Sequence, residues 1–418
     1  MTAREVVLKT LYMIEKDNAY CDKALKQQLN ADMLKEDINL ITNLVYGITD
    51  KKRRLDYIIE NYSTQKLNKI SLWIKIILRM GIYQILFMDK IPHSAAVNES
   101  VKLAKRYGHG ASAGFVNAIL RNIVRNGDVL YPKDNISVFY SVPDWLTEML
   151  ESQYGLEDTI KTFDAFSKVS PTTIRVNKIK TSSECLKERL ENTGIKVNNT
   201  ICDDMLEISD FGDLSKLKEY KDGLFTPQDI SAYLTGETVA PKKGDFIIDV
   251  CSAPGGKTTH MAEIINNDGT IVAFDLYPHK VDIIESNCKR LGITCVNAKV
   301  WDSMILNEEY VGKADKVLAD VPCSGLGVIG KKFDIKWHRT PENIEEIIKI
   351  QDTILENASR YLKHGGELVY STCTINKNEN RDVIDRFIKG SNFKIVQDKT
   401  IMPYEGSDGF YICKMIKE

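Results

Sequence analysis

The sequence predicts a multidomain fold, in which an all-α region is followed by a small α+β unit and then by an α/β domain with a parallel sheet. Long amphipathic runs with few β-branched clusters occupy the chain up to about Asn126. A β-α-β-β order follows, and strands alternate with helices after Lys243. The length of 418 residues, with 43% hydrophobic and 27% charged residues, suits a globular chain of about two to four domains.

The all-α region is expected over residues 1–130. Thr2 is placed as an N-cap, with Ala3, Val7 and Leu11 on one face of the first helix. Residues 131–168 have a mixed pattern, and the stretch DWLTEMLESQYG predicts a short helical connector within them. The expected helices of the first region cover residues 3–17, 35–48, 51–61, 69–88, 94–107 and 112–126.

The small α+β unit is expected over residues 169–237. TTIRVN reads as a strand and TSSECLKERLENTG as a helix, and IKVNN, MLEIS and GLFTPQD then read as strands. This order of elements is typical of a ferredoxin-like unit.

The last region, residues 238–418, is expected to form the α/β domain. Strict alternation of strand and helix implies a parallel sheet with helices on both faces and ligands at the carboxyl ends of the strands. A short connection without a helix joins the final two strands, so one of them should be antiparallel. The expected strands are DFIIDV, GTIVAFDL, TCVNAKV, ADKVLADVP, GELVYSTCT, FKIVQD and GFYICKMIK.

Composition excludes several classes of protein. The nine cysteines contain no C-x-x-C pair, which argues against a disulfide framework and against a zinc site, so no metal is expected. The net charge of -2 excludes a chain that is basic throughout, as a histone is, but it allows a local basic surface that could bind nucleic acid. The most apolar segment, SLWIKIILRMGIYQILFM, carries Lys75 and Arg79, which are costly in lipid. The N-terminus lacks the pattern of a signal peptide, so a cytoplasmic protein with no membrane contact is expected.

A glycine-rich turn, DVCSAPGGKTT, follows the first strand of the α/β domain. Its tail resembles a phosphate-binding P-loop, but Cys251 stands where that template requires glycine. Asp275 ends the second strand, where a carboxylate can accept both hydroxyls of a ribose, and Asp302 follows the third strand, where it can receive an adenine amino group. These features predict an adenine nucleoside site, with S-adenosylmethionine favoured over a dinucleotide. The expected cofactor contacts are Cys251, Ser252, Ala253, Pro254, Gly255, Gly256, Lys257, Asp275, Asp302 and Asp320.

Two cysteines are expected at the same edge of the sheet as this turn. The fourth strand runs into ADVPCSGLG, which brings Asp320 and Cys323 to that edge, and the fifth runs into YSTCT, which brings Cys373 there. A single strand cysteine is usually inert packing. Two thiols beside a nucleoside site and an aspartate indicate covalent chemistry instead.

With these motifs the C-terminal part resembles the Sun family of RNA cytosine-5 methyltransferases, whose signatures it carries as DVCSAPGGKTT, ADVPCSGLGVIG and YSTCTINKNEN. The stretches NLVYGITDKKRRLDYIIE, HSAAVNESVKLAKRYG and AGFVNAILRNIVRN are similar to the NusB-like helical RNA-binding domain. The resemblance therefore implies three parts: a NusB-like domain, a ferredoxin-like unit and a Rossmann-like S-adenosylmethionine-dependent methyltransferase domain. It also implies 16S rRNA as the substrate, with cytosine 967 as the methylated nucleotide.

The resemblance implies roles for four residues. Cys373 is the expected nucleophile that adds to carbon 6 of the base, and Cys323 assists removal of the carbon-5 proton. Asp320 is expected to hold the N3 and N4 edge of the pyrimidine. Lys257 either supports that arrangement or contacts the cofactor carboxylate.

RNA contacts are expected from basic residues in all three parts of the chain, and each expectation has a structural alternative. A charge run is usually a solvated face, and Arg175 and Asn177 can equally make internal hydrogen bonds. The protein is expected to be a monomer. The candidate RNA contacts are Lys51, Lys52, Arg53, Arg54, Arg175, Asn177, Lys331, Lys332 and Lys336.

Three alternative functions stay open at the level of sequence. A phosphate-loop NTPase would leave Cys323 and Cys373 unexplained. A non-catalytic RNA-binding assembly factor would need only the helical region. Within the enzyme class, another rRNA cytosine or a tRNA is the competing substrate.

Overall fold

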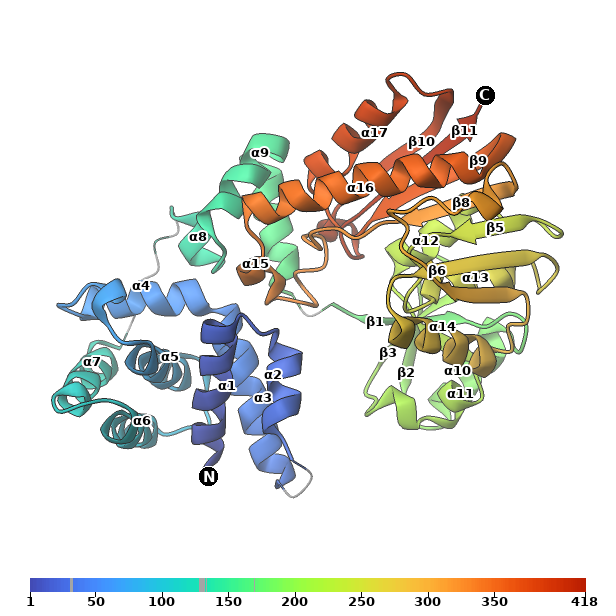
Figure 1. Cartoon of the computed structure of the whole chain (residues 1–418). Coiled ribbons are helices and arrows are strands. Elements are labelled where there is room, and N and C mark those ends of the chain that lie inside the picture. The colour runs from blue at the N-terminus through green and yellow to red at the C-terminus, as the bar shows by residue number, and fades with distance from the viewer. Residues whose placement is uncertain (31–32, 128–131, 133, 169) are drawn as a thin grey trace. The chain divides into compact units, whose positions relative to one another are not determined.

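The computed structural model describes the whole chain except residues 31–32, 128–131, 133 and 169 (Figure 1). The chain divides into two compact units. The helical unit comprises residues 1–163 together with 332–338, and the catalytic unit comprises residues 164–331 and 339–418. No helix of the described chain is both long enough and apolar enough to cross a membrane.

In the helical unit, the helices between residues 3 and 126 pack around one apolar core. Thr2 caps the first helix by accepting a hydrogen bond from the Glu5 N–H, as the sequence predicts. The expected helices are all present. Two more, Cys21–Gln28 and Ile136–Phe139, were missed because eight and four residues are too few to show a clear period. The helices are α1 (Ala3–Asp17), α2 (Cys21–Gln28), α3 (Lys35–Asp50), α4 (Lys52–Tyr62), α5 (Leu72–Phe87), α6 (His93–Tyr107), α7 (Ser112–Asn126), α8 (Ile136–Phe139) and α9 (Asp144–Phe166), with the 3-10 turn η1 (Leu67–Lys69) between α4 and α5.

A short segment from late in the sequence, residues 332–338 with helix α15 (Ile335–His338), also belongs to the helical unit. The Cys21 N–H donates to the carboxylate of Asp334 over 2.9 Å. The indole N–H of Trp337 donates to the carbonyl of Thr49 over 2.7 Å. These bonds fix the segment as a structural part of the helical core.

In the catalytic unit, the small sheet has the order β2-β3-β1-β4 and is antiparallel throughout. Apolar side chains of its strands and of α10 form a separate core beneath it, as expected for a ferredoxin-like unit. The elements are β1 (Thr172–Val176), α10 (Ser183–Glu191), β2 (Lys196–Asn199), β3 (Met205–Ser209), η2 (Leu214–Lys216), α11 (Lys218–Lys221), β4 (Phe225–Pro227) and α12 (Ile230–Val239).

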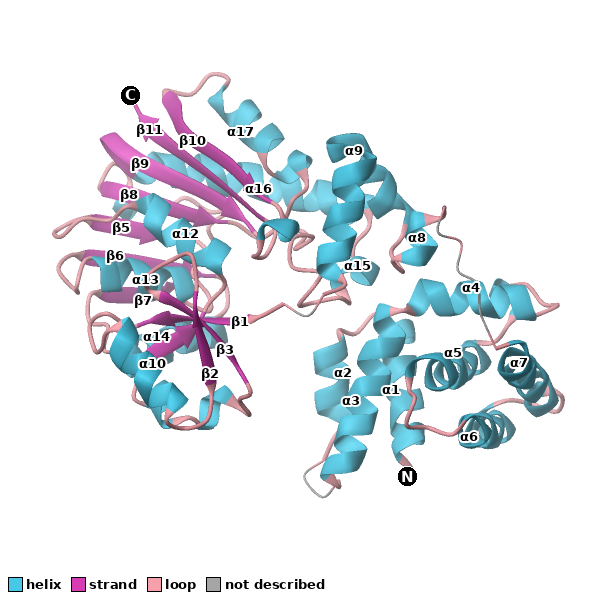
Figure 2. Ribbon diagram, turned by 180° about the vertical axis from the view of Figure 1, so that it is seen from behind, coloured by secondary structure: helices cyan, strands magenta, loops and turns pink. Residues whose placement is uncertain are grey.

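The large sheet has seven strands in the order β10-β11-β9-β8-β5-β6-β7 (Figure 2). The pairs from β9 through β7 are parallel, and β11 is antiparallel to both of its neighbours, which confirms the prediction that one of the final two strands is antiparallel. Its elements are β5 (Phe246–Asp249), α13 (Gly256–Ile264), β6 (Thr270–Asp275), α14 (Pro278–Leu291), β7 (Val296–Val300), η3 (Glu308–Tyr310), β8 (Ala314–Asp320), α16 (Pro341–Tyr361), β9 (Leu362–Thr372), η4 (Lys377–Glu379), α17 (Arg381–Ile388), β10 (Phe393–Ile401), η5 (Pro403–Glu405) and β11 (Phe410–Lys417).

Helices cover both faces of this sheet. Residues of α16 and α17 pack into the core on one face, and residues of α12, α13 and α14 pack into the core on the other. A parallel sheet buried on both faces brings the carboxyl ends of its strands to one edge, where loops are free to carry chemistry. The Rossmann-like fold predicted from the alternating strands is therefore present.

Candidate active site

The two predicted cysteines lie together just beyond the carboxyl ends of β8 and β9. These strands are parallel neighbours, with Asp320 paired in register with Ser371. The Sγ atoms of Cys323 and Cys373 are 3.3 Å apart, far longer than the ~2.05 Å of a disulfide. The hydrogen bond with Cys373, together with burial, raises the pKa of the Cys323 thiol well above its usual value. Cys323 therefore keeps its proton more firmly than an ordinary cysteine.

A buried carboxylate, Glu379, holds the two cysteine-bearing loops together. It is fully buried and accepts hydrogen bonds from the backbone N–H of Ser324 (2.7 Å) and from its hydroxyl (2.5 Å). From the other loop it accepts a bond from the side-chain amide of Asn376 (3.0 Å), and from α16 a longer one from Gln351 (3.3 Å). All of these donors are neutral, so the charge of Glu379 is balanced by hydrogen bonds alone.

Asp320 lies next to the thiols and is held on both carboxylate oxygens. Oδ2 accepts from the ammonium of Lys257 over 2.7 Å, and Oδ1 accepts from the hydroxyl of Ser371 over 2.8 Å. The ammonium also lies 5.0 Å from the ring centre of Phe410. Burial works to lower the pKa of Lys257, but the charge of Asp320 outweighs it and the net pKa is raised. Lys257 is thus a fixed cation that orients Asp320.

The glycine-rich turn begins α13 in the way the sequence predicts. Gly255 is the residue before the helix and has φ of +97°, a left-handed conformation that disfavours other residues. The hydroxyl of Ser252 closes the turn by donating to the carbonyl of Asp249 over 2.9 Å. Thr258 donates to the carboxylate of Asp249 over 2.7 Å. Burial raises the pKa of Asp249 to about 6, despite the Thr258 bond that opposes this shift.

The two aspartates expected around the nucleoside end β6 and follow β7. The Asp275 carboxylate accepts from the backbone N–H groups of Ala253 (3.2 Å) and Tyr277 (3.3 Å), which ties the turn to the second strand. Asp302 accepts from the N–H of Met304 over 2.9 Å. A backbone turn at a helix N-terminus supplies N–H donors, and the carboxylates at the ends of the next two strands supply acceptors. Together these groups suit an adenosine with a charged amino-acid tail. The residues present therefore fit S-adenosylmethionine.

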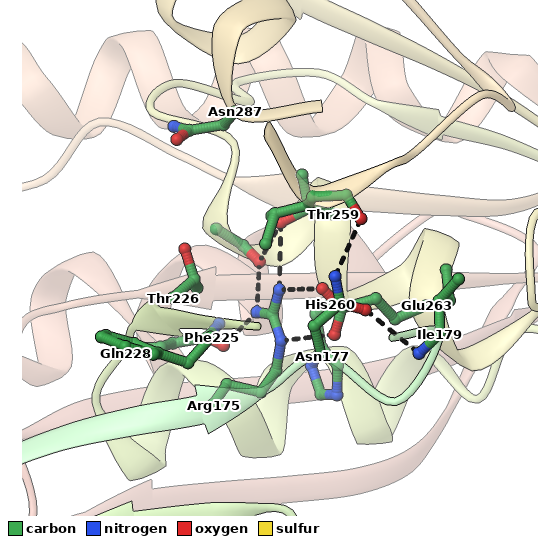
Figure 3. Close-up of polar contacts among 12 residues, drawn as sticks. Arg175, Asn177, Ile179, Phe225, Thr226, Gln228, Thr259, His260, Glu263 and Asn287 are labelled. Carbon is green, nitrogen blue, oxygen red and sulfur yellow. Dashed lines mark hydrogen bonds and ion pairs between the residues drawn. The ribbon is translucent and has the colours of Figure 1, made fainter. Parts of the chain in front are cut away.

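Arg175, expected at the RNA surface or in an internal bond, is buried behind this turn (Figure 3). Its guanidinium binds both carboxylate oxygens of Glu263, each over 2.9 Å, and donates to the carbonyl of Gly256 over 2.8 Å and to Thr259 over 3.1 Å. It also contacts Gln228. Arg175 thus joins the small sheet to the helix that begins at the cofactor turn.

Asn177 is buried as well, and its side-chain amide donates to the carbonyls of Gly223 and Leu291, each over 2.8 Å. The expectation of RNA contacts by Arg175 and Asn177 is corrected in favour of the structural alternative, because neither side chain presents surface to a phosphate.

The expected basic clusters are mostly engaged by the protein itself. Lys336 is buried and paired with Asp50 over 2.8 Å, so the expectation that it contacts RNA is also corrected. Lys331 bridges Asp229 (2.5 Å) and Asp408 (2.9 Å). Lys332 is exposed.

The run from 51 to 54 has carboxylate or aromatic partners within the helical unit. Lys51 pairs with Asp50, Lys52 with Glu15, and Arg53 with Asp144. The guanidinium of Arg54 lies 5.4 Å from the ring centre of Phe139.

Sequence reasoning missed the groups that hold the site in place. Glu379 stands within the quoted stretch YSTCTINKNEN, yet its burial behind both cysteines depends on β8 and β9 being neighbours. Ser371 and Glu263 were missed for the same reason, since each partners a residue more than fifty positions away. The available signal for Glu379 was its place in that stretch, as a charged residue within a motif of small polar and amide residues.

Three family models match successive parts of the chain. A model described as NusB family matches residues 1–125, one described as an RsmF/B-like ferredoxin-like domain matches residues 142–214, and one described as 16S rRNA methyltransferase RsmB/F matches residues 237–416.

Individual relatives and structures agree with these matches. A probable ribosomal RNA small subunit methyltransferase B of Bacillus subtilis is 33% identical, with 100% of this chain and 99% of the relative covered. The crystal structure of PH0851 has a TM-score of 0.81 at 26% identity, covering 98% of this chain and 97% of that one. NSun6 from Pyrococcus horikoshii with SFG has a TM-score of 0.62 at 25% identity, covering 66% of this chain and 98% of that one.

The relative from Bacillus subtilis is matched along the whole chain, and the models follow the three parts in order. A NusB-like helical domain, a ferredoxin-like unit and a Rossmann-like catalytic domain, with a glycine-rich turn and two facing thiols at one sheet edge, thus occur in a single chain. The chain belongs to the RsmB family of S-adenosylmethionine-dependent 16S rRNA methyltransferases.

Proposed function

We propose that this protein forms 5-methylcytosine in 16S rRNA, with cytosine 967 as its target, through a covalent bond between Cys373 and carbon 6 of the base. The observation that carries the proposal is the pair of thiols 3.3 Å apart beside the Lys257–Asp320 pair. Carbon 5 of cytosine is too weak a nucleophile to take a methyl group directly. Addition of a thiolate to carbon 6 turns carbon 5 into an enamine carbon, which is strongly nucleophilic.

The two thiols are proposed to have different roles, according to which of them carries the proton. We assign the thiolate to Cys373 and the proton to Cys323, an assignment that the raised pKa of Cys323 supports. The S–H of Cys323 would then be the donor across the 3.3 Å between the two sulfur atoms. Once the sulfur of Cys373 is bonded to carbon 6, its negative charge no longer raises the pKa of Cys323. Cys323 can then release its proton to solvent and, as a thiolate, take the hydrogen from carbon 5. The electron pair of that C–H bond forms the double bond between carbons 5 and 6 and expels the thiolate of Cys373 from carbon 6.

Asp320 and Lys257 orient the base. Asp320 is proposed to accept from the N4 amino group and to favour a proton on N3 as the ring takes up the thiolate. The bonds from Lys257 and Ser371 leave each carboxylate oxygen with a further lone pair for this purpose. Of the two roles considered for Lys257, its bond to Asp320 favours support of that carboxylate.

S-adenosylmethionine supplies the methyl group when it is bound. The turn from Cys251 to Lys257 with Asp275, Asp302 and Asp320 is proposed to hold it, and the residues of this chain position it for in-line transfer. Both faces of the pyrimidine are needed, so the target base must leave its stack, which is cheapest for an unpaired loop nucleotide.

The oligomeric state, the location, the partners and the RNA contacts are also proposals. The protein is proposed to act as a monomer in the cytoplasm, on RNA, with no membrane and no metal. Lys51, Lys52, Arg53, Arg54 and Lys331 stay secondary candidates for RNA contacts, because their charges already have partners. Lys332 is the more accessible candidate.

The test is methyl transfer from labelled S-adenosylmethionine to 16S rRNA by wild type, Cys373→Ala and Cys323→Ala, with denaturing gels and mapping of 5-methylcytosine. We expect one methylated cytosine with wild type and no transfer with Cys373→Ala. Cys323→Ala should accumulate a protein–RNA adduct that survives denaturation.

Other outcomes separate the alternatives. Retained activity in Cys373→Ala, or an adduct that persists in that variant, would show that the thiol roles are wrong or reversed. Methylation at another position of rRNA or in tRNA would leave the chemistry intact and change the target. No transfer to any RNA by wild type would favour a binding factor.

A further inference from the structure

The helical unit contains one stretch of unbalanced positive charge. From residue 92 to residue 127 the sequence has five lysine and arginine residues and a single carboxylate, Glu99, while the chain as a whole carries a net charge of -2. Glu99 pairs with Lys102, and Arg106 pairs with Glu5. Most of the excess charge therefore stays on α6 and α7, and it did not stand out in the sequence because the basic residues are not consecutive.

A groove of about 720 Å³ lies between these two helices. Val97 and Val124 contribute its apolar part. The polar groups that line it include His93 and Asn98 from α6 and Arg121 and Arg125 from α7. Its volume falls in the range of ~300–1,000 Å³ that is typical of small-molecule sites, which is the scale of individual nucleotides.

The two arginines of the groove differ from the basic run at residues 51–54. Arg121 donates to the side-chain oxygen of Asn117 over 2.9 Å, and Arg125 donates to that of Asn122 over 2.9 Å. Both partners are neutral, and both arginines are exposed. Within the described part of the chain, no carboxylate lies within ion-pair distance of either guanidinium. Lys51, Lys52 and Arg53 have such partners.

We propose that the groove between α6 and α7 binds the RNA substrate, with Arg121 and Arg125 on backbone phosphates and a base against the half-buried Val124. The inference rests on the proposed action on RNA and adds a second contact site on the substrate. A guanidinium held by a neutral amide keeps its full charge and two free edges for phosphate oxygens. The amides of Asn98 and Asn122 offer donors and acceptors to the edge of an unpaired base.

The first experiment measures binding of transcribed 16S rRNA, at several salt concentrations, to Arg121→Gln/Arg125→Gln. The matched control is Lys23→Gln/Lys26→Gln, which removes the same charge from exposed positions on α2 of the same unit. We expect the groove variant to bind about tenfold more weakly, and the slope of log K against log salt to become shallower by about one to two. The control should change both quantities much less.

Two further readouts make the result specific. Arg121→Lys/Arg125→Lys keeps the charge and should recover part of the affinity. RNA carrying 4-thiouridine should crosslink, on irradiation, to peptides within residues 93–98 or 118–125. Circular dichroism and binding of S-adenosylhomocysteine should match wild type for all variants, since the substituted side chains are exposed.

The outcomes keep the inference apart from the proposed function. Wild type that methylates RNA, together with a groove variant whose RNA affinity equals that of the control, overturns the groove and leaves the function standing. Crosslinks confined to peptides outside α6 and α7 overturn it as well. Wild type that transfers methyl to no RNA contradicts the proposed function itself, whatever the groove binds.

Discussion

Two buried glutamates lie behind the two halves of the active site, and the protein stabilises them in different ways. Glu263, behind the cofactor turn, is paired with Arg175, a full cation held on both of its oxygens. Glu379, behind the thiols, accepts bonds from Ser324, Asn376 and Gln351, all of them neutral. The cofactor half is therefore fixed by a charge pair and the thiol half by a network of dipoles.

The difference has a chemical reason. The charge of Glu379 helps to raise the pKa of Cys323, and a cation paired with Glu379 would cancel that contribution. Neutral donors fix the two loops without doing so. No thiol with a proposed catalytic role lies on the cofactor side, and a bidentate ion pair gives the more rigid joint between the small sheet and α13.

The largest expected effect comes from breaking the charge pair with Arg175→Met. This change leaves Glu263 buried without its cation, and the free energy of unfolding should fall by about 3–5 kcal/mol. Urea unfolding below the melting temperature measures it. Binding of S-adenosylhomocysteine should weaken as well, because the carbonyl of Gly256 loses its donor.

The matched control for this variant is the double change Arg175→Met/Glu263→Met. Removal of both charges should restore most of the lost stability, because a buried pair can be replaced by apolar groups at little net cost. If the single and double variants were equally unstable, packing and not charge would explain the loss.

A smaller effect is expected from Glu379→Gln. The backbone N–H of Ser324 and the amide of Asn376 donate to different carboxylate oxygens, and the amide of glutamine has only one oxygen. One buried donor therefore loses its partner, and stability should fall by about 1–3 kcal/mol. Turnover should drop about tenfold or more because the two thiols lose their fixed separation. Affinity for S-adenosylhomocysteine should stay within about twofold of wild type.

Asn376→Ala is the companion variant, since it removes one donor and keeps the carboxylate. It should lower turnover less than Glu379→Gln does. Equal loss of cofactor affinity in the Arg175 and Glu379 variants would show that the two halves of the site are not independently supported.

The smallest change in stability is expected at a third buried carboxylate, Asp249, and it should depend on pH. Its pKa is about 6 in the folded chain against ~3.9 when unfolded, so folding favours its protonated form. The stability it contributes is present below about pH 4 and is lost as pH rises to about 6. Asp249→Asn should therefore gain about 1–2 kcal/mol over wild type at pH 7.5, after the weaker bond to Thr258 is allowed for, and nothing at pH 4.

Urea midpoints at the two pH values check this expectation. Asp268→Asn, an exposed change in the same domain, is the control and should shift the midpoint little at either pH. An equal gain for Asp249→Asn at both pH values would contradict the account based on protonation.

Most of the helices and strands, and the sheet edge that carries the candidate site, could be predicted because they follow from local pattern and from general rules of α/β sheets. Cys323 and Cys373 were expected together because each follows a strand that ends at the same edge. What could not be predicted were partners distant in sequence. Arg175 lies 88 positions from Glu263, so its residue type alone cannot distinguish an ion pair in the core from a contact with phosphate. Lys336 was misplaced for the same reason, since Asp50 is 286 positions away.

Residues 332–338 have a consequence for the way this chain can be divided. They begin only nine positions after Cys323, yet they pack in the helical unit through Asp334, Lys336 and Trp337. A protease that cut the chain once near residue 163 would yield two fragments that stay associated. A shortened gene that starts at residue 164 would leave Trp337 and its neighbours without the helices they pack against, so the catalytic half would need a redesigned loop to be produced alone.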